Sequence, residues 1–215
     1  VAQLEFNEIE KSIQKDQHKL KVSIFAKGIF AIIAIGTVLS MLQQFTGINA
    51  VLYYGADIFE KALGFGKEDV LLQQVLLAGI NLLFTFVAMA TVDKFGRKPL
   101  LYIGAVGMLA GFLLLGATLM TDSVGILSLV GVLLFIASFA MSMGPVVWVI
   151  LSEMFPNSIR SAAMSIAVAA QWAANYLVTQ SFPMVAESKM NESDLWNGSL
   201  PYFIFSIFIL GIIFF

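Results

Sequence analysis

The chain has 215 residues, of which 59% are hydrophobic and 12% are charged, and its formal net charge is −2. An average soluble domain is about a quarter charged, so this composition argues against a soluble fold. Because the chain has no cysteine, it can form neither a disulfide framework nor a thiolate metal site.

The first 26 residues precede the long apolar stretches and have a pattern of their own. Their apolar side chains keep a helical spacing among charged residues: Phe6, Ile9, Ile13 and Leu20. This spacing predicts a short amphipathic helix over 2–20 that lies on a membrane surface or packs on nearby loops. The alternative is a solvated linker. In either case the segment 1–26 is set apart from a membrane domain at 27–215.

Six later stretches contain no Asp, Glu, Lys or Arg. Even the shortest of them, 195–215, reaches about 30 Å as a helix, which is the thickness of the hydrocarbon core of a bilayer. Transmembrane β-strands would be about ten residues long and alternate in polarity, and none of the stretches alternates. We therefore predict an all-α membrane protein whose six spans cover about 27–58, 70–92, 99–121, 123–152, 161–186 and 197–215.

The basic residues indicate how these spans are oriented. Three segments that fall on one side of the membrane, 1–27, 93–98 and 153–160, hold nine of the twelve Lys and Arg residues. By the positive-inside rule this side is cytoplasmic. Both ends of the chain, and the segment 1–26, are therefore expected in the cytoplasm.

The first and fourth stretches are the longest, and each is interrupted by residues that break helices. Gly47 interrupts the first, and Gly144 with Pro145 interrupts the fourth. Broken helices at matching positions of two three-helix units are typical of an inverted repeat, and they indicate a substrate site between them. Proline kinks without a function are common in membrane helices, so the polar residues near the breaks matter as well.

Those polar residues are neutral amides and aromatics. They are Gln43, Gln44, Asn49, Tyr53, Tyr54, Asn81, Trp148, Gln171, Trp172 and Asn175. Amides both donate and accept hydrogen bonds, as sugar hydroxyls do, and an indole face can cover the C–H surface of a sugar. Gln44 and Asn49 can share one side only if the helix unwinds near Gly47, which glycine permits. Each amide taken alone could instead bond one helix to another.

The sequence offers nothing from which to build a catalytic site. It has no nucleophile-base pair, no phosphate-binding glycine loop and no cluster of metal ligands, and its one histidine, His18, lies in the first segment. We expect no enzymatic activity, no cofactor, no metal and no nucleic acid partner.

Four motifs in order resemble the sugar porter family of the major facilitator superfamily over nearly the whole chain. They are Gln43 to Asn49 with Tyr53-Tyr54, Asp93 to Lys98, Gly144 to Trp148, and Ser152 to Pro156 with Arg160. Within the family, Val92 to Leu100 and Ile166 to Tyr176 are most similar to the proton-coupled xylose symporters of bacteria. Met143 departs from them, because they tend to carry Trp at that position.

The resemblance implies a fold and a set of site residues. The fold is the C-terminal six-helix bundle, made of two inverted three-helix repeats, of a twelve-helix transporter. The chain begins without an initiator Met and ends in an apolar run, so an N-terminal six-helix half is expected upstream. The sugar site would be lined by Gln43, Gln44, Asn49, Tyr53, Asn81, Trp148, Gln171 and Trp172. A cytoplasmic latch would involve Asp93, Gly96, Arg97, Glu153 and Arg160, with the two arginines within reach of the two acids.

The function that the resemblance implies is proton-coupled symport of a pentose or hexose such as D-xylose, by alternating access, across a bacterial inner membrane. A proton-coupled carrier needs a titratable group in its interior, and the six spans contain none. The coupling carboxylate is therefore expected in the N-terminal half. Two alternatives are a passive sugar uniporter and a membrane sugar sensor that does not transport. A channel is less favoured, because no charged ring or filter sequence occurs.

Overall fold

The computed structural model of this chain describes residues 27–55, 58 and 70–215. Within these residues the chain forms α-helices joined by turns, and no strand occurs. This confirms the predicted all-α fold. The proposed amphipathic helix over 2–20 lies outside the described residues.

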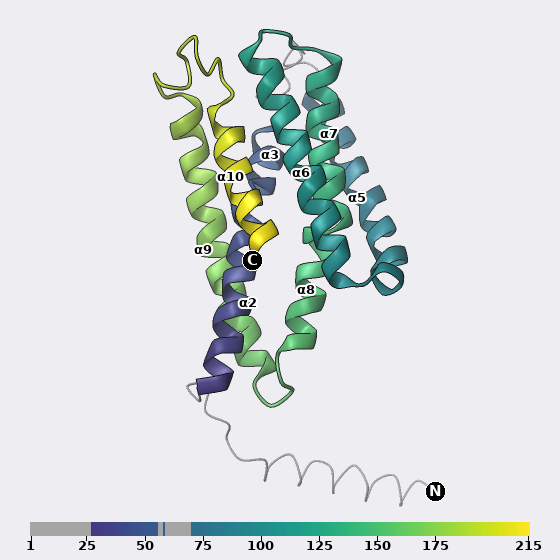
Figure 1. Ribbon diagram of the computed structural model, residues 1–215. Helices are drawn as coiled ribbons and strands as arrows, with labels where there is room; N and C mark the ends of the chain where they lie inside the picture. The colour runs from purple at the N-terminus through teal and green to yellow at the C-terminus, as the bar shows by residue number, and fades with distance from the viewer. Residues whose placement is uncertain (1–26, 56–57, 59–69) are drawn as a thin grey trace, which may run out of the picture.

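The helices follow the six charge-free stretches in order (Figure 1). They are α2 (Lys27–Phe45), α3 (Ile48–Tyr53), α5 (Val70–Phe95), α6 (Arg97–Met120), α7 (Ile126–Met141), α8 (Met143–Met154), α9 (Arg160–Ala186) and α10 (Leu200–Phe214). The first stretch is split into α2 and α3, and the fourth into α7 and α8. Each of the other four stretches forms one helix.

Four segments are long and apolar enough to cross a membrane: Gly28–Tyr53, Leu71–Phe95, Arg97–Met120 and Ile126–Met154. The helix α9 has 27 residues, but amides such as Gln171 and Asn175 make it less apolar. The helix α10 is strongly apolar and has 15 residues. The chain is therefore a multi-pass membrane protein in which α9 is the most polar long helix.

The first break lies at Gly47, as predicted. Its φ of 84° is left-handed, a conformation that residues with a side chain seldom adopt. A Cβ atom at this position would also lie 2.6 Å from the ring of Phe205 on α10. Glycine is therefore required both by the backbone turn and by the aromatic side chain packed against it.

The second break lies at Ser142, upstream of the predicted Gly144 and Pro145. Proline has no N–H to donate, and its ring collides with the carbonyl of the residue four positions earlier in a continuous helix. Here that earlier residue is Met141, and α7 ends on it. Pro145 then falls in the first turn of α8, where its missing N–H has no helical partner to lose. The proline therefore breaks the span several residues before its own position.

The closest packing joins α6 to α7. A Cβ atom on Gly111 would lie 2.7 Å from the backbone oxygen of Gly131, so the two helix backbones touch. Small residues at such crossings give membrane helices the van der Waals contact that holds them together. In addition, α2 packs on α9, and α10 contacts α2 and α9 as well as α6, so α2, α9 and α10 lie together on one side of the bundle (Figure 1).

The connection between α9 and α10 is tied down by two asparagines. Asn191 is buried, donates from Nδ2 to the Ala186 oxygen at 2.7 Å and accepts at Oδ1 from the Leu200 N–H at 3.0 Å. Asn197 donates to the Leu119 oxygen, at the end of α6, at 2.7 Å. The connection therefore has a fixed shape and is attached to a third helix.

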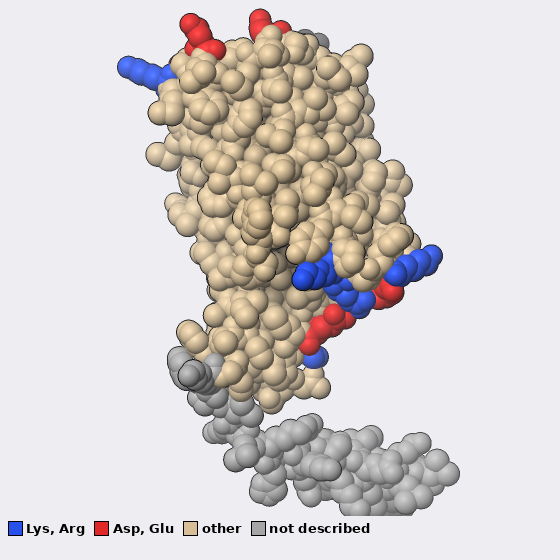
Figure 2. All heavy atoms as spheres, viewed as in Figure 1, with Lys and Arg blue, Asp and Glu red and all other residues tan. Residues whose placement is uncertain are grey.

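The charged side chains described in the structure gather at the two ends of the bundle, with an uncharged belt between them on the face that Figure 2 shows. The turns at the lower end in Figure 1, between α5 and α6 and between α8 and α9, hold Asp93, Lys94, Arg97, Lys98, Glu153 and Arg160. The connections after α6 and α9, at the other end, hold Asp122, Glu187, Lys189, Glu192 and Asp194. An uncharged belt between charged ends is expected of a protein that spans a bilayer.

Candidate functional site

Gln43, near the end of α2, connects three helices. It is buried, with 2% of its surface exposed. Its Nε2 donates to the Met143 oxygen at 2.6 Å and to the Gly144 oxygen at 3.1 Å, both in the first turn of α8. Its Oε1 accepts from Nε2 of Gln171, on α9, at 2.6 Å. The side chain therefore lies where α2, α8 and α9 meet.

Gln44 and Asn49 face each other across the first break. Asn49 Nδ2 donates to Gln44 Oε1 at 2.7 Å. The two residues are five positions apart, so an unbroken helix would have turned them to different sides. The turn at Gly47 brings them to the same side, as the spacing predicted.

These amides border one open hollow of about 200 Å³. It is lined by Gln43, Gln44, Ile48, Asn49, Leu52, Asn81, Phe139, Gly144, Trp148 and Gln171. Six of the eight predicted sugar-site residues are thus brought together, from α2, α3, α5, α8 and α9. The other four residues of the lining were not in the predicted set. Ile48 and Leu52 are apolar and at helical spacing, and could have been recognised only once the course of α3 was known.

Two of the predicted residues lie outside this lining. Tyr53 and Trp172 are 58% and 62% exposed and do not border the hollow. Tyr54 packs between helices, since it stacks on Phe182 with ring centroids 5.1 Å apart and its hydroxyl donates to the Thr179 oxygen at 3.2 Å. Asn175 is buried one turn from Gln171 and likewise does not border the hollow.

The hollow is suited to a neutral ligand with many hydroxyl groups. Its described lining has amides that donate and accept, the indole of Trp148 and apolar walls, and no ionisable side chain. Three larger hollows are also described. Two, of about 400 and 360 Å³, lie at the end of the bundle that carries Asp122, Glu187 and Glu192. The third, of about 250 Å³, is mostly apolar and lies beside Arg97 and Lys98. We place the candidate site in the smaller hollow because the amides of several helices converge there.

A charged cluster lies at the lower end of the bundle. Arg97 holds Glu153 of α8 through two hydrogen bonds, Nη2 to Oε1 at 2.7 Å and Nε to Oε2 at 3.2 Å. Its Nη1 also lies 3.1 Å from Oδ1 of Asp93. Gly96, between these two residues, has a φ of 84° and turns the chain between α5 and α6. The cluster therefore ties the α5–α6 turn to the end of α8.

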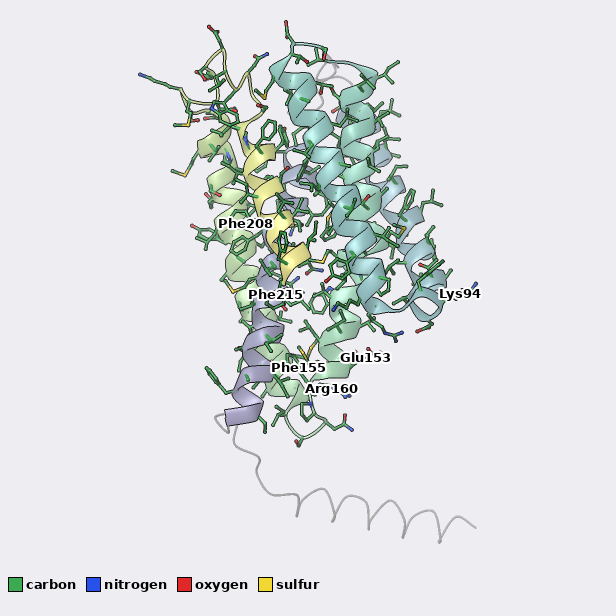
Figure 3. The ribbon with its side chains drawn as sticks, in the orientation of Figure 1. Lys94, Glu153, Phe155, Arg160, Phe208 and Phe215 are labelled. Atoms are coloured by element: carbon green, nitrogen blue, oxygen red, sulfur yellow. The ribbon has the colours of Figure 1, made fainter. Side chains whose placement is uncertain are left out.

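Arg160 was predicted to lie within reach of Glu153 and Asp93, and its described hydrogen bond goes to a backbone oxygen. It lies near Glu153 and Phe155 (Figure 3), but its Nε donates to the Phe155 oxygen at 3.2 Å. No ion pair joins it to an acid within the part of the chain that the structure describes. The reason is local: the turn between α8 and α9 brings the Phe155 carbonyl close to the first residue of α9.

A family model described as "Sugar (and other) transporter" matches residues 1–215. The D-xylose-proton symporter of Escherichia coli (strain K12) is 46% identical over 196 residues, which cover 87% of this chain and 39% of the relative. The glucose facilitated diffusion protein of Zymomonas mobilis is 44% identical over 209 residues, which cover 97% of this chain and 44% of that protein. The arabinose-proton symporter of Bacillus subtilis is 35% identical over 189 residues, covering 87% and 40%.

Solved structures agree with these relatives. A crystal structure of a D-xylose-proton symporter superposes with a TM-score of 0.79 at 45% identity, covering 96% of this chain and 46% of that one. The inward open form of the xylose transporter XylE from E. coli gives a TM-score of 0.73 at 44% identity, covering 95% and 42%. The chain thus spans less than half the length of each of these proteins.

Proposed function

This chain belongs to the sugar transporter family of the major facilitator superfamily, and we propose that it is the C-terminal half of a sugar carrier. In this proposal residues 27–215 form the membrane domain and 1–26 a cytoplasmic segment that links it to an N-terminal half of six helices. Members of the family transport solutes and are not enzymes. The single observation that carries the proposal is the convergence of Gln44, Asn49 and Gln171 on one hollow beside both helix breaks.

The sugar is proposed to bind in this hollow. Gln44, Asn49, Asn81 and Gln171 would hydrogen-bond its hydroxyls, and Trp148 would cover its C–H surface. Gln43 borders the same space. Tyr53 and Trp172 are proposed from the resemblance to complete the site together with the other half, since both are exposed in this half alone.

The transport reaction is proposed to be proton-coupled symport of a pentose or hexose such as D-xylose. Two relatives are named as proton symporters, for xylose and for arabinose. The described lining of the hollow has no ionisable side chain. The carboxylate that couples proton and sugar transport would therefore belong to the N-terminal half. Passive diffusion is a second candidate, because a relative at 44% identity is named for facilitated diffusion of glucose.

The two halves would expose the site to one side of the membrane and then to the other. The end with Arg97 and Glu153 is proposed to face the cytoplasm of a bacterium, with both chain ends on that side of the inner membrane. There, Asp93, Gly96, Arg97, Glu153 and Arg160 would form a latch that favours closure of the cytoplasmic side. Basic residues concentrated at this end support that orientation.

The test is uptake by the full-length protein in proteoliposomes, with and without a proton gradient, for D-xylose and D-glucose. Symport predicts saturable uptake of the preferred sugar that accumulates only when a gradient is imposed. Equilibration that ignores the gradient would establish the passive carrier instead. Absence of saturable uptake of both sugars would overturn the transport proposal. Gln180→Leu is the control for substitutions in the hollow, because this glutamine of α9 is exposed and does not border the hollow. It should transport like the unmodified protein.

A further inference from the structure

The short helix α3 contributes to the hollow but is too short to hold its own position. It spans only six residues, and three of them, Ile48, Asn49 and Leu52, line the hollow. Isolated helices shorter than about 12 residues are marginal, and helices in proteins are stabilised mostly by packing. Gly47, the N-cap of α3, has no side chain with which to cap the helix. The position of α3 must therefore be set by other elements.

The two ends of α3 pack on phenylalanines of two other helices. At its start, a Cβ atom on Gly47 would lie 2.6 Å from the ring of Phe205 on α10, so this ring packs directly on the turn. At its end, the ring of Tyr54 stacks on Phe182 of α9 with centroids 5.1 Å apart. The Tyr54 hydroxyl also donates to the Thr179 oxygen of α9 at 3.2 Å.

These two phenylalanines form one stacked pair. The rings of Phe182 and Phe205 are nearly parallel, at 5°, with centroids 6.2 Å apart, and each residue is only 6% exposed. Aromatic pairs in such an offset arrangement attract each other beyond the effect of their buried area. Phe112 of α6, which is fully buried, stacks on Phe205 with centroids 5.8 Å apart. Neither Phe182 nor Phe205 borders the hollow.

From this geometry we infer that Phe182 and Phe205 are positioning residues for sugar binding. The pair contacts both ends of α3 and so keeps Asn49 within hydrogen-bonding distance of Gln44 at the edge of the hollow. A polar group that is already in place binds its ligand more tightly, because less freedom is lost on binding. The inference rests on the proposed function for its effect on sugar affinity, whereas its effect on α3 can be measured without a sugar.

Hydrogen–deuterium exchange of the α3 amides is the measurement that needs no sugar. Phe205→Leu removes the ring from the turn and leaves a cavity beside it. In the full-length protein in nanodiscs, we expect mass spectrometry to show exchange in α3 that is at least about fivefold faster than in the unmodified protein.

Phe155→Leu is the matched control. This fully buried ring lies at the lower end of the bundle (Figure 3) and packs on a glycine of the same span, because a Cβ atom on Gly36 of α2 would lie 2.6 Å from it. The substitution therefore removes the same kind of contact at a distance from α3. We expect it to lower the thermal midpoint as Phe205→Leu does, and to leave exchange in α3 unchanged.

A double-mutant cycle connects the stacked pair to the sugar. We expect Phe205→Leu to raise the Kd for D-xylose by roughly threefold or more, as measured by isothermal titration, and Phe155→Leu to change it by less than about twofold. When Asn49→Leu is already present, Phe205→Leu should change the Kd by less than about twofold, because no amide is left to position. A residue that only stabilises the fold would not show this dependence on Asn49.

Exchange in α3 that is the same in Phe205→Leu as in Phe155→Leu would overturn the inference. An effect of Phe205→Leu on the Kd that is equal with and without the Asn49 amide would overturn the link to sugar binding. If Phe205→Leu does not fold, Phe182→Leu serves in its place, because it removes the ring that stacks on Tyr54, and the expected and opposing results are the same. Failure of the unmodified protein to bind sugar would count against the proposed function alone, since exchange would still decide the role of the pair.

Discussion

The bond between Asn49 and Gln44 sets the geometry of a hydrogen-bonding pair at the edge of the hollow. Asn49→Leu removes one amide and leaves the Gln44 carbonyl without its described partner. We expect the affinity for sugar to fall by roughly fivefold, since a lost hydrogen bond is worth about 1 kcal/mol. Isothermal titration of the full-length protein with D-xylose measures this change. An affinity equal to that of the Gln180→Leu control would remove Asn49 from the site.

The pair formed by Arg97 and Glu153 predicts a change in conformation with little change in stability. Their side chains are 33% and 52% exposed, and exposed ion pairs contribute only about 0 to 1 kcal/mol. Glu153→Lys places two positive charges together, so we expect it to favour the inward-open state, as seen by greater labelling of cytoplasmic positions. Combining it with Arg97→Glu should restore the original labelling.

The control for this charge reversal is Glu187→Lys, an exposed acid at the other end of the bundle. Identical labelling in the Glu153 variant, the Glu187 variant and the unmodified protein would contradict the latch. A large fall in the thermal midpoint of the Glu153 variant alone would show instead that the pair mainly stabilises the fold.

The break between α2 and α3 is specified by packing from another helix as well as by its own glycine. Gly47→Ala requires alanine to adopt a left-handed backbone, which costs about 1 to 2 kcal/mol. It also places a Cβ 2.6 Å from the Phe205 ring. We therefore expect a clear loss of thermal stability in the purified protein, which Phe205→Leu in the same chain partly recovers.

Gly211→Ala on α10 is the matched control, because a Cβ there meets nothing within 4 Å. Alanine favours a helix over glycine by up to about 1 kcal/mol, so this variant should be unchanged or slightly more stable. Equal stability of the Gly47 and Gly211 variants would show that neither the turn nor the ring contact constrains the break.

Much of the arrangement of helices was predictable, because a bilayer requires long stretches without charge and these stretches are visible in the sequence. The break at Gly47 was also predictable, because it depends on a glycine that stands at the break itself. The second break was misplaced because the effect of Pro145 falls on the carbonyl of Met141, four residues earlier. The hydrogen bond from Arg160 to the Phe155 oxygen could not be deduced, because it depends on how the turn after α8 folds back.

The residues of the candidate site were predictable as a group but not in their individual contacts. Neutral amides at bilayer depth near two breaks indicated a shared hollow, and six of the eight chosen residues border one. The difference between Gln43 and Gln44 could not be deduced, because it depends on carbonyl groups 100 residues away. The family resemblance, which rested on four motifs, is confirmed by the family model and by the relatives.

At the scale of the whole molecule, the hollow is open, and two aromatic residues proposed for the site, Tyr53 and Trp172, are exposed. The chain spans less than half the length of its relatives, so the opposite wall is expected from the N-terminal half. We predict that residues 1–215 expressed alone give no sugar uptake, and that co-expression with the upstream half of the same protein restores it. Acrylamide quenching of Trp172 fluorescence should decrease on assembly.

Residues 1–215 with the substitution Trp172→Phe provide the control for the quenching measurement. Uptake by residues 1–215 alone would refute the division of the site between two halves. Restored uptake without any change in quenching would show that Trp172 faces lipid and not the other half.

The fixed connection between α9 and α10 has a practical consequence. Asn191 and Asn197 hold it to the ends of three helices, so its shape exists only when those helices are packed. A nanobody selected against this connection would recognise a discontinuous epitope and would lose it when the bundle unfolds. Such a reagent could sort folded from misfolded transporter during purification without touching the sugar hollow.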